Sequence, residues 1–242
     1  MKTTWRLLAA MGIIAVGFLL GTALGGYAGR ARGVFQMEGV PPRIILDAGH
    51  GGEDGGTSAP NGKPESAYNL EITLRLRDML SLLGYPVRMI RTEDVSVYTE
   101  GDTIARKKVS DLRNRVKAVN AVPNGILVSI HQNFYGDSRY RGAQVFYGGG
   151  EESKTLAALL QERLRLGLDS SNNRKIKRGE GIYLLDKTQG TRVLVECGFL
   201  SNPQEAAALA DGAYQKRIAA VLAAALAEYL EIPESGGNPY SS

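Results

Sequence analysis

The chain of 242 residues contains 43% hydrophobic and 22% charged residues, which is the composition of a globular protein with a sizeable core. Its net charge of +4 fits contact with an anionic polymer such as cell wall or with an anionic membrane surface. The basic residues lack the aromatic interleaving of a single-strand binder, so no nucleic-acid partner is expected. The single cysteine, Cys197, excludes an internal disulfide framework and a multi-cysteine zinc cluster.

Residues 1–29 are predicted to be a signal peptide or a membrane anchor that precedes the folded domain. Lys2 and Arg6 come before an uncharged stretch, residues 7–29, that is rich in Leu, Ala, Ile and Gly. A typical signal-peptide apolar region has roughly 7–15 residues, so the length of this stretch favours an anchor, whereas Ala23-Leu24-Gly25 offers a cleavage pattern. Either interpretation predicts export, with the membrane as a partner if the segment is retained. Residues 30–42 are predicted to be a linker.

Short apolar runs alternate with helical patterns through the rest of the chain. The predicted strands are at 44–46, 86–90, 126–130, 142–147, 181–185 and 192–196. The predicted helices are at 65–83, 103–121, 151–168 and 213–230, with a further helix start at 201–205. This alternation predicts a single α/β domain over residues 43–231, in which a mostly parallel (mixed), twisted sheet of about six strands is flanked by helices. Residues 232–242, rich in Gly, Pro and Ser, are predicted to be a disordered tail.

Both histidines of the chain, His50 and His131, stand at or just after the end of a predicted buried strand. The carboxyl ends of parallel strands meet at one edge of a sheet, so the two imidazoles indicate a metal site there. A catalytic zinc takes three protein ligands from His and Asp or Glu, which leaves one carboxylate to be found. The candidates that spacing leaves open are Glu53, Asp54, Glu65 and Glu71. Glu65 is the best placed, because it opens a helix directly after a loop that can return to the His50 edge.

Carboxylates also stand near the ends of two predicted strands. Glu196 follows Val-Leu-Val, where burial of a carboxylate is costly unless the group has a partner or a task. General acid/base catalysis beside a metal site is such a task, and a salt-bridged strand end is the structural alternative. Asp47 is predicted either to orient an imidazole or to accept a hydrogen bond from the loop backbone. Cys197 is predicted to be a small buried core residue.

Four segments resemble the signature blocks of the zinc-dependent N-acetylmuramoyl-L-alanine amidases (the amidase type 3 family), in the family's order. They are DAGHGGEDGG at residues 47–56, ESAYNL at 65–70, SIHQN at 129–133 and VECGFLSN at 195–202. The resemblance implies that His50, Glu65 and His131 hold one zinc ion and that Glu196 is the catalytic carboxylate. It also implies that the substrate is peptidoglycan, cut at the amide between the lactyl group of N-acetylmuramic acid and L-alanine.

A narrower resemblance is to the germination-specific amidases of spore formers. It depends on RTED at residues 91–94 with Tyr98, GAQVFY at 142–147, VECGF at 195–199 and the N-terminal hydrophobic segment. In that subgroup the amidase strips the peptide from muramic acid in spore cortex, before muramic-δ-lactam forms. The implied location is extracytoplasmic, in the intermembrane space or cortex of a developing spore. A lipoprotein activator, known for some members, is a possible partner.

Arg91, Asn133 and the basic stretch 174–178 are candidates for contact with substrate carboxylates or sugars, with solvated loop residues as the alternative. Three other functions remain open. They are a vegetative cell-wall amidase (an autolysin), a zinc peptidase that cuts elsewhere in the stem peptide, and a catalytically silent wall-binding scaffold. The complete set of reactive residues argues against the scaffold, because a degenerate homologue usually loses one of them.

Overall fold

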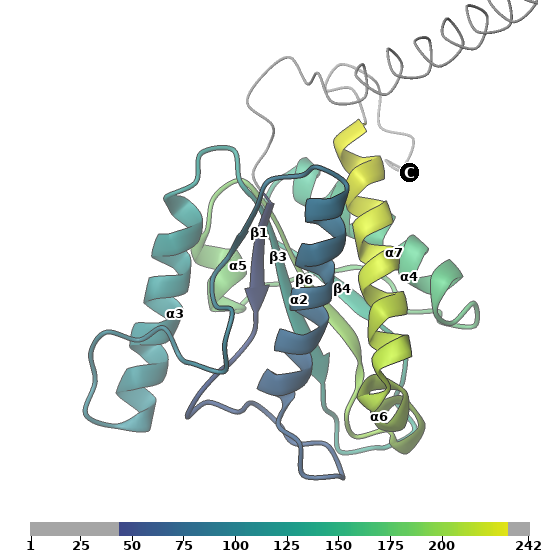
Figure 1. Cartoon of the computed structure of the whole chain (residues 1–242), viewed down its shortest axis with the longest axis horizontal. Helices are drawn as coiled ribbons and strands as arrows, with labels where there is room; N and C mark the ends of the chain where they lie inside the picture. Colours follow the sequence, from purple (N-terminus) through teal and green to yellow (C-terminus); the bar gives the residue numbers. More distant parts are fainter. Residues whose placement is uncertain (1–43, 232–242) are drawn as a thin grey trace, which may run out of the picture. The chain divides into compact units, whose positions relative to one another are not determined.

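The computed structural model describes residues 44–231, which contain a six-stranded mixed sheet in the order β2-β1-β3-β6-β4-β5 (Figure 1). The strands are β1 Ile44–Ala48, β2 Val87–Met89, β3 Ile126–Asn133, β4 Gln144–Tyr147, β5 Lys177–Arg178 and β6 Thr191–Phe199. β1 pairs in parallel with β2 and β3, β3 with β6, and β4 with β5, whereas β4 and β6 are antiparallel. The predicted α/β fold is therefore confirmed.

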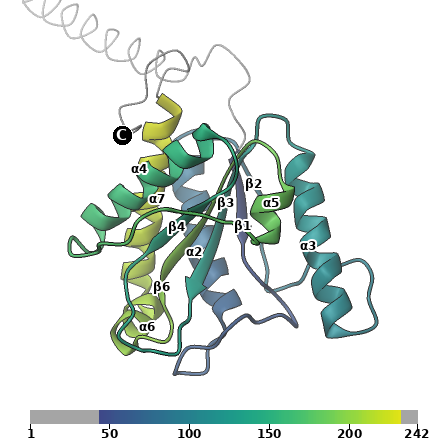
Figure 2. The ribbon, with the colours of Figure 1, turned by 180° about the vertical axis from the view of Figure 1, so that it is seen from behind.

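Helices cover both faces of the sheet. They are α2 Glu65–Leu82, α3 Ile104–Asn120, α4 Glu151–Gly167, α5 Tyr183–Lys187, α6 Pro203–Ala210 and α7 Gly212–Glu231. The larger core lies between the sheet and α2, α4, α6 and α7, and the smaller core lies between the sheet and α3 and α5. α5 lies next to α3 on this second face (Figure 2).

Alternation along the strands divides the apolar side chains between the two cores. In β1, Ile44 and Leu46 enter the larger core and Ile45 enters the smaller one. In β3, Val128 belongs to the larger core and Leu127 to the smaller one. Side chains of a strand point to opposite faces in turn, so a strand covered on both faces is a near-continuous apolar run. This explains why β1 and β3 each begin with a run of three apolar residues.

The prediction of a strand at residues 181–185 is wrong, because the chain forms the short helix α5 there. Gly181, with φ of 81°, turns the chain just before the helix, and Leu184 and Leu185 bury their side chains. A five-residue apolar run has the same pattern in a buried strand and in a short helix. The predicted loop at 169–178 instead contains the two-residue strand β5, which pairs with β4.

Not all apolar residues of α3 face the sheet. Ile104 and Val109 are exposed, whereas Asp111 and Arg115 are buried beside Val119. Arg115 and Asp111 form an ion pair one helical turn apart, with Arg115 Nε 2.6 Å from Asp111 Oδ2. The face of α3 that meets the sheet edge is therefore built partly from charges that neutralise each other.

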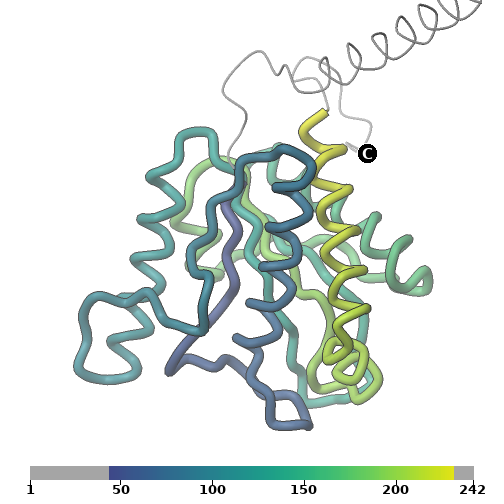
Figure 3. The backbone as a smooth tube through the Cα atoms, viewed as in Figure 1, coloured from purple at the N-terminus to yellow at the C-terminus, as the bar shows by residue number. Residues whose placement is uncertain are grey.

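The carboxyl ends of β1 and β3 point toward the lower side of the molecule in Figure 1, where the segment after β1 crosses to α2 (Figure 3). We call this segment, residues 49–64, the His50 loop. The predicted signal or anchor segment 1–29, the linker 30–42 and the tail 232–242 lie outside the described residues. Among residues 44–231, no helix combines the length and hydrophobicity needed to cross a membrane.

Candidate metal centre and catalytic site

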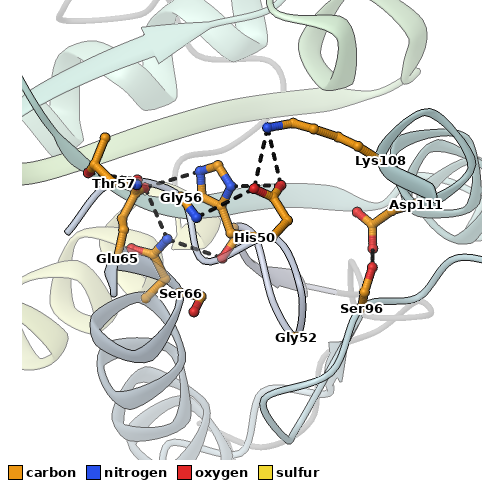
Figure 4. A network of polar contacts seen from close by, with 12 residues as sticks. His50, Gly52, Gly56, Thr57, Glu65, Ser66, Ser96, Lys108 and Asp111 are labelled. Carbon is orange, nitrogen blue, oxygen red and sulfur yellow. Dashed lines mark hydrogen bonds and ion pairs between the residues drawn. The ribbon is translucent and has the colours of Figure 1, made fainter. Parts of the chain in front are cut away.

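Three side chains from three separate elements meet at the carboxyl edge of the sheet. His50 lies in the His50 loop, Glu65 is the first residue of α2, and His131 lies near the end of β3. One donor atom of each side chain lies within 4.8 Å of the donor atoms of the other two. Glu65 Oε1 is 3.4 Å from His50 Nε2 and 3.1 Å from His131 Nδ1, and Figure 4 shows Glu65 facing the His50 ring. Two imidazole nitrogens and one carboxylate oxygen at this spacing fit a zinc ion.

Two of the other candidate carboxylates are held elsewhere. Glu53 forms an exposed ion pair with Lys107, whose Nζ is 2.8 Å from its Oε1. Glu71 binds Lys63 at 2.6 Å and accepts a hydrogen bond from Gln215 at 2.7 Å. Neither carboxylate joins the cluster around the histidines, so the geometry favours Glu65 as the third ligand.

The glycines of the His50 loop allow His50, Glu65 and His131 to approach one another. A Cβ on Gly49 would lie 2.2 Å from Nε2 of His131, and a Cβ on Gly56 would lie 2.6 Å from Oε2 of Glu65. His50 itself has a φ of 60°, in the left-handed region that non-glycine residues rarely adopt. Such backbone conformations persist where the surroundings enforce them, and they concentrate at functional sites.

Because of this crowding, we expect Gly49→Ala to displace the His131 ring. The purified variant should hold less metal, and it should lose about 1–3 kcal/mol of unfolding free energy, as overpacked sites do. Metal analysis and denaturant unfolding would measure both effects. Gly136→Ala is a matched control, because a Cβ there meets no atom within 4 Å. Full metal content in Gly49→Ala would contradict the prediction.

The Glu65 carboxylate is fixed by neighbours on both oxygens. Oε2 accepts hydrogen bonds from the backbone N–H and the hydroxyl of Thr57, at 3.2 and 3.3 Å. Oε1 accepts from Asn69 Nδ2 and from the Gln132 backbone N–H, both at 3.2 Å. Burial by itself raises the pKa of Glu65, but the hydrogen bonds with His131 and His50 outweigh burial and lower the pKa well below its usual range. The carboxylate is therefore ionised, as a metal ligand must be.

Asp54 orients the ring of His50. Its Oδ2 lies 3.0 Å from His50 Nδ1, and its carboxylate also pairs with Lys108. Figure 4 shows Lys108 reaching toward the His50 loop from α3. Burial lowers the pKa of His50, but the hydrogen bonds with Asp54 and Glu65 outweigh it and raise the pKa to about 9. A carboxylate on the second ring nitrogen of a ligand histidine fixes the ring and makes it more basic.

We therefore expect Asp54→Asn to weaken zinc binding by about 10–100-fold, the usual effect of removing such a partner. A competitive titration with a zinc-sensitive dye would measure the change. Glu53→Gln is the matched control, since this adjacent carboxylate is exposed and pairs only with Lys107 among the described residues. Equal zinc affinities for the two variants would contradict the assignment of Asp54.

Glu196 lies beside this cluster. In the sheet it is opposite His131 of β3 on one side and opposite Gln144 of β4 on the other. Its Oε2 is buried and has no hydrogen-bond partner among the described residues. Burial raises the pKa of Glu196 to about 7, so both protonation states are accessible near neutral pH. A carboxylate with a free buried oxygen and such a pKa is suited to accept and donate a proton.

The model of the N-acetylmuramoyl-L-alanine amidase family matches residues 44–228. The chain belongs to this family. Over 199 residues it is 39% identical to the germination-specific N-acetylmuramoyl-L-alanine amidase of Bacillus subtilis (strain 168), with 81% of this chain and 82% of that protein covered. The enzyme is thus an N-acetylmuramoyl-L-alanine amidase, and its substrate is peptidoglycan.

Solved structures agree with this membership. The CwlD amidase from Clostridioides difficile, in complex with the GerS lipoprotein, is similar with a TM-score of 0.76 and 39% identity. This match covers 79% of the present chain and 100% of that chain. The catalytic domain of CwlV from Bacillus (Paenibacillus) polymyxa var. colistinus has a TM-score of 0.66 and 28% identity, covering 79% and 99% of the two chains.

Of the residues expected to contact substrate, Arg91 lies in the interior of the amidase. Its guanidinium donates to the carbonyls of Ala48 at 2.8 Å, Gly49 at 3.0 Å and Ser66 at 2.8 Å. These contacts indicate that Arg91 holds the His50 loop in place. They do not support the predicted contact between Arg91 and substrate. Asn133 ends β3 at the edge of the site and stays a predicted substrate contact.

Sequence reasoning missed a second buried arginine, Arg115 of α3. It binds the Asp47 carboxylate and donates to the carbonyls of Ala48 at 3.0 Å and His50 at 2.7 Å. Asp47 also accepts a hydrogen bond from the Ser129 hydroxyl at 2.6 Å. Asp47 therefore fixes the arginine that holds the His50 loop, and no hydrogen bond joins it to an imidazole among the described residues.

Proposed function

We propose that this amidase uses zinc held by His50, Glu65 and His131, with Glu196 as the catalytic carboxylate. We propose further that it strips the peptide from muramic acid in spore-cortex peptidoglycan, before muramic-δ-lactam forms. The observation that carries the chemistry is the convergence of the three donor groups beside a carboxylate whose Oε2 is buried and unpaired. The cortex role is supported by the 39% identity to a germination-specific amidase.

Each residue has a defined part in this reaction. A zinc ion held by His50, Glu65 and His131 would supply Lewis-acid chemistry that polarises the amide carbonyl and makes the attacking water more acidic. Glu196 takes the proton of the attacking water and passes it to the nitrogen of the departing L-alanine. Asp54 fixes the orientation of His50, and the hydrogen bonds from Thr57 and Asn69 keep the Glu65 carboxylate in place.

Digestion of spore-cortex peptidoglycan by the zinc-loaded full-length protein tests the proposal. Mass spectrometry should find free peptides that begin with L-alanine, together with muramic acid that has lost its peptide. Peptides with another N-terminus would identify a zinc peptidase instead. Equal or faster release from vegetative wall would identify a general autolysin, and no release from any wall would indicate a catalytically silent scaffold.

Metal dependence makes a separate prediction. We expect about one zinc per chain in the purified protein, loss of activity on chelation, and recovery on addition of zinc. His131→Ala should contain little zinc and should not recover, because it removes a ligand. Metal analysis alongside peptide release would check both expectations. Activity that survives complete removal of metal would refute the assignment.

We also propose that the amidase acts outside the cytoplasm and binds a lipoprotein. The location is supported by the peptidoglycan substrate of the amidase family, which lies outside the cytoplasm, and the partner by the solved complex of CwlD with the GerS lipoprotein. Size-exclusion chromatography of the amidase mixed with a GerS-type lipoprotein should give a co-migrating complex. Separate elution at concentrations of about 10 µM would limit any interaction to a weak one.

A further inference from the structure

A groove of about 580 Å³ lies at the same edge of the sheet as the proposed catalytic centre. It is formed by the segment between β3 and β4, residues 134–143, and by the segment between α4 and β5, residues 168–176. The first segment follows directly from the strand that carries His131. Both segments therefore continue the surface on which a substrate of the amidase must lie.

Three arginines line this groove, and two of them are paired with acids. Arg139 contacts Asp137 at 2.7 Å, and Arg141 lies 3.8 Å from Asp169. Arg174 forms no ion pair within residues 44–231. The groove therefore contains one cation that no carboxylate of the described chain contacts in an ion pair. The buried Glu205 interacts with Arg174 electrostatically, but its two carboxylate oxygens accept hydrogen bonds from the backbone N–H groups of Gly142 and Phe199.

Arg174 is nevertheless held in place. It donates from Nε to the Arg141 carbonyl at 2.7 Å and from Nη1 to Gln144 Oε1 at 3.1 Å. The guanidinium carbon lies 4.5 Å from the centre of the Phe199 ring and 5.8 Å from that of Tyr140. These contacts use two of the five guanidinium N–H donors, which leaves three for a ligand. A guanidinium oriented in this way loses little entropy on binding.

The position of Arg174 relates it to the scissile amide. Phe199, on which it stacks, lies three residues after Glu196 on β6, and Gln144, which it binds, is opposite Glu196 on β4. Three residues of a regular strand span roughly 10 Å, and the register shift between β3 and β6 at this point makes the span somewhat shorter. An extended peptide covers a similar distance in about three residues. A carboxylate within the first three residues of the departing peptide can therefore reach Arg174.

We propose that Arg174 is a substrate-binding residue that recognises a carboxylate in the first residues of the stem peptide. The inference deepens the proposed amidase function and rests on it. A planar guanidinium with free paired donors matches a carboxylate, which it can bind through two hydrogen bonds. A sugar-stacking role fits Arg174 less well, because its guanidinium covers the face of the buried Phe199 ring. Exposed Tyr135 and Tyr140 are better placed for sugars.

The test uses pairs of muropeptides that carry either a free carboxylate or a carboxamide at the second or third peptide residue. For one of these two positions, Arg174→Gln should raise KM for the carboxylate substrate by about 10–100-fold, because this is the effect of losing one hydrogen bond to a charged group. The same substitution should change kcat by less than about two-fold. It should change KM for the matching carboxamide little. The wild-type enzyme should prefer that carboxylate by a similar factor, and Arg174→Lys should retain part of the preference.

Arg139→Gln is the matched control, because Arg139 lies in the same groove but is exposed and paired with Asp137. It should keep the wild-type preference. The inference would be overturned if Arg174→Gln raised KM equally for the carboxylate and the carboxamide substrate of each pair. It would also be overturned if the wild-type enzyme showed no preference for either carboxylate. The wild-type comparison decides the question even if Arg174→Gln does not fold. Failure of the wild-type enzyme to release peptide from any of these substrates would instead overturn the proposed function.

Discussion

Replacing Glu196 with glutamine should lower kcat for peptide release by about 10²–10⁴-fold, the usual contribution of general acid/base catalysis. Glutamine has nearly the same shape as glutamate but cannot take the proton of water or return it to the amine. Glu196 is also not one of the three clustered donors, so the variant should keep its zinc. Stopped-time assays on purified muropeptides, with metal analysis of the same samples, would separate the two properties.

Two comparisons sharpen this experiment. Glu196→Asp keeps a carboxylate but withdraws it from the reaction centre. Its rate should therefore lie between those of the wild-type enzyme and Glu196→Gln. Glu180→Gln removes an exposed carboxylate from a distant loop and should leave the rate unchanged. A near-normal rate in Glu196→Gln would remove this residue from the mechanism. A slow variant that has lost its zinc would instead assign Glu196 a role in metal binding.

Much of this site is predictable because parallel strands bring their carboxyl ends together. β1, β3 and β6 are neighbours in the sheet, so the ends that carry His50, His131 and Glu196 are adjacent. Strand apolarity and the two isolated histidines predict two of the expected ligands. Spacing leaves the third expected ligand open, because its identity depends on how the His50 loop folds back to α2.

Other features were not visible in the sequence because they depend on tertiary contacts. β5 has only two residues and exists through its pairing with β4. Arg91 and Arg115 resemble surface residues in sequence, yet both are buried because they satisfy backbone carbonyls of the chain that leads into the His50 loop. The one available signal was the Asp111–Arg115 spacing of four on a helix, which is equally common on exposed faces.

Of the substitutions considered for this amidase, Arg115→Met should cause the largest loss of unfolding free energy. Methionine fills a similar space but leaves the Asp47 carboxylate, which is 1% exposed, without its cation. Removing one member of a buried ion pair costs about 3–5 kcal/mol, which denaturant unfolding would measure. The variant should also bind zinc more weakly, because the His50 carbonyl loses its donor. Arg113→Met, on the exposed side of the same helix, is the matched control and should change little.

The loss in Arg115→Met should depend on pH in a defined direction. In the native amidase, burial raises the pKa of Asp47, but Arg115 and the Ser129 hydroxyl outweigh burial and lower it below the usual 3.8. A lowered native pKa stabilises the fold at pH values above the unfolded pKa, and this contribution is lost as the pH falls through the native value.

In Arg115→Met, burial dominates and raises the pKa of Asp47. As the pH falls below neutral, the Asp47 carboxyl is protonated, and the variant recovers part of the stability that it lacks at pH 7. The difference in unfolding free energy between the two proteins should therefore be largest near pH 7 and should shrink toward pH 4. A difference that is constant over this range would show that lost packing, and not the unpaired carboxylate, causes the destabilisation.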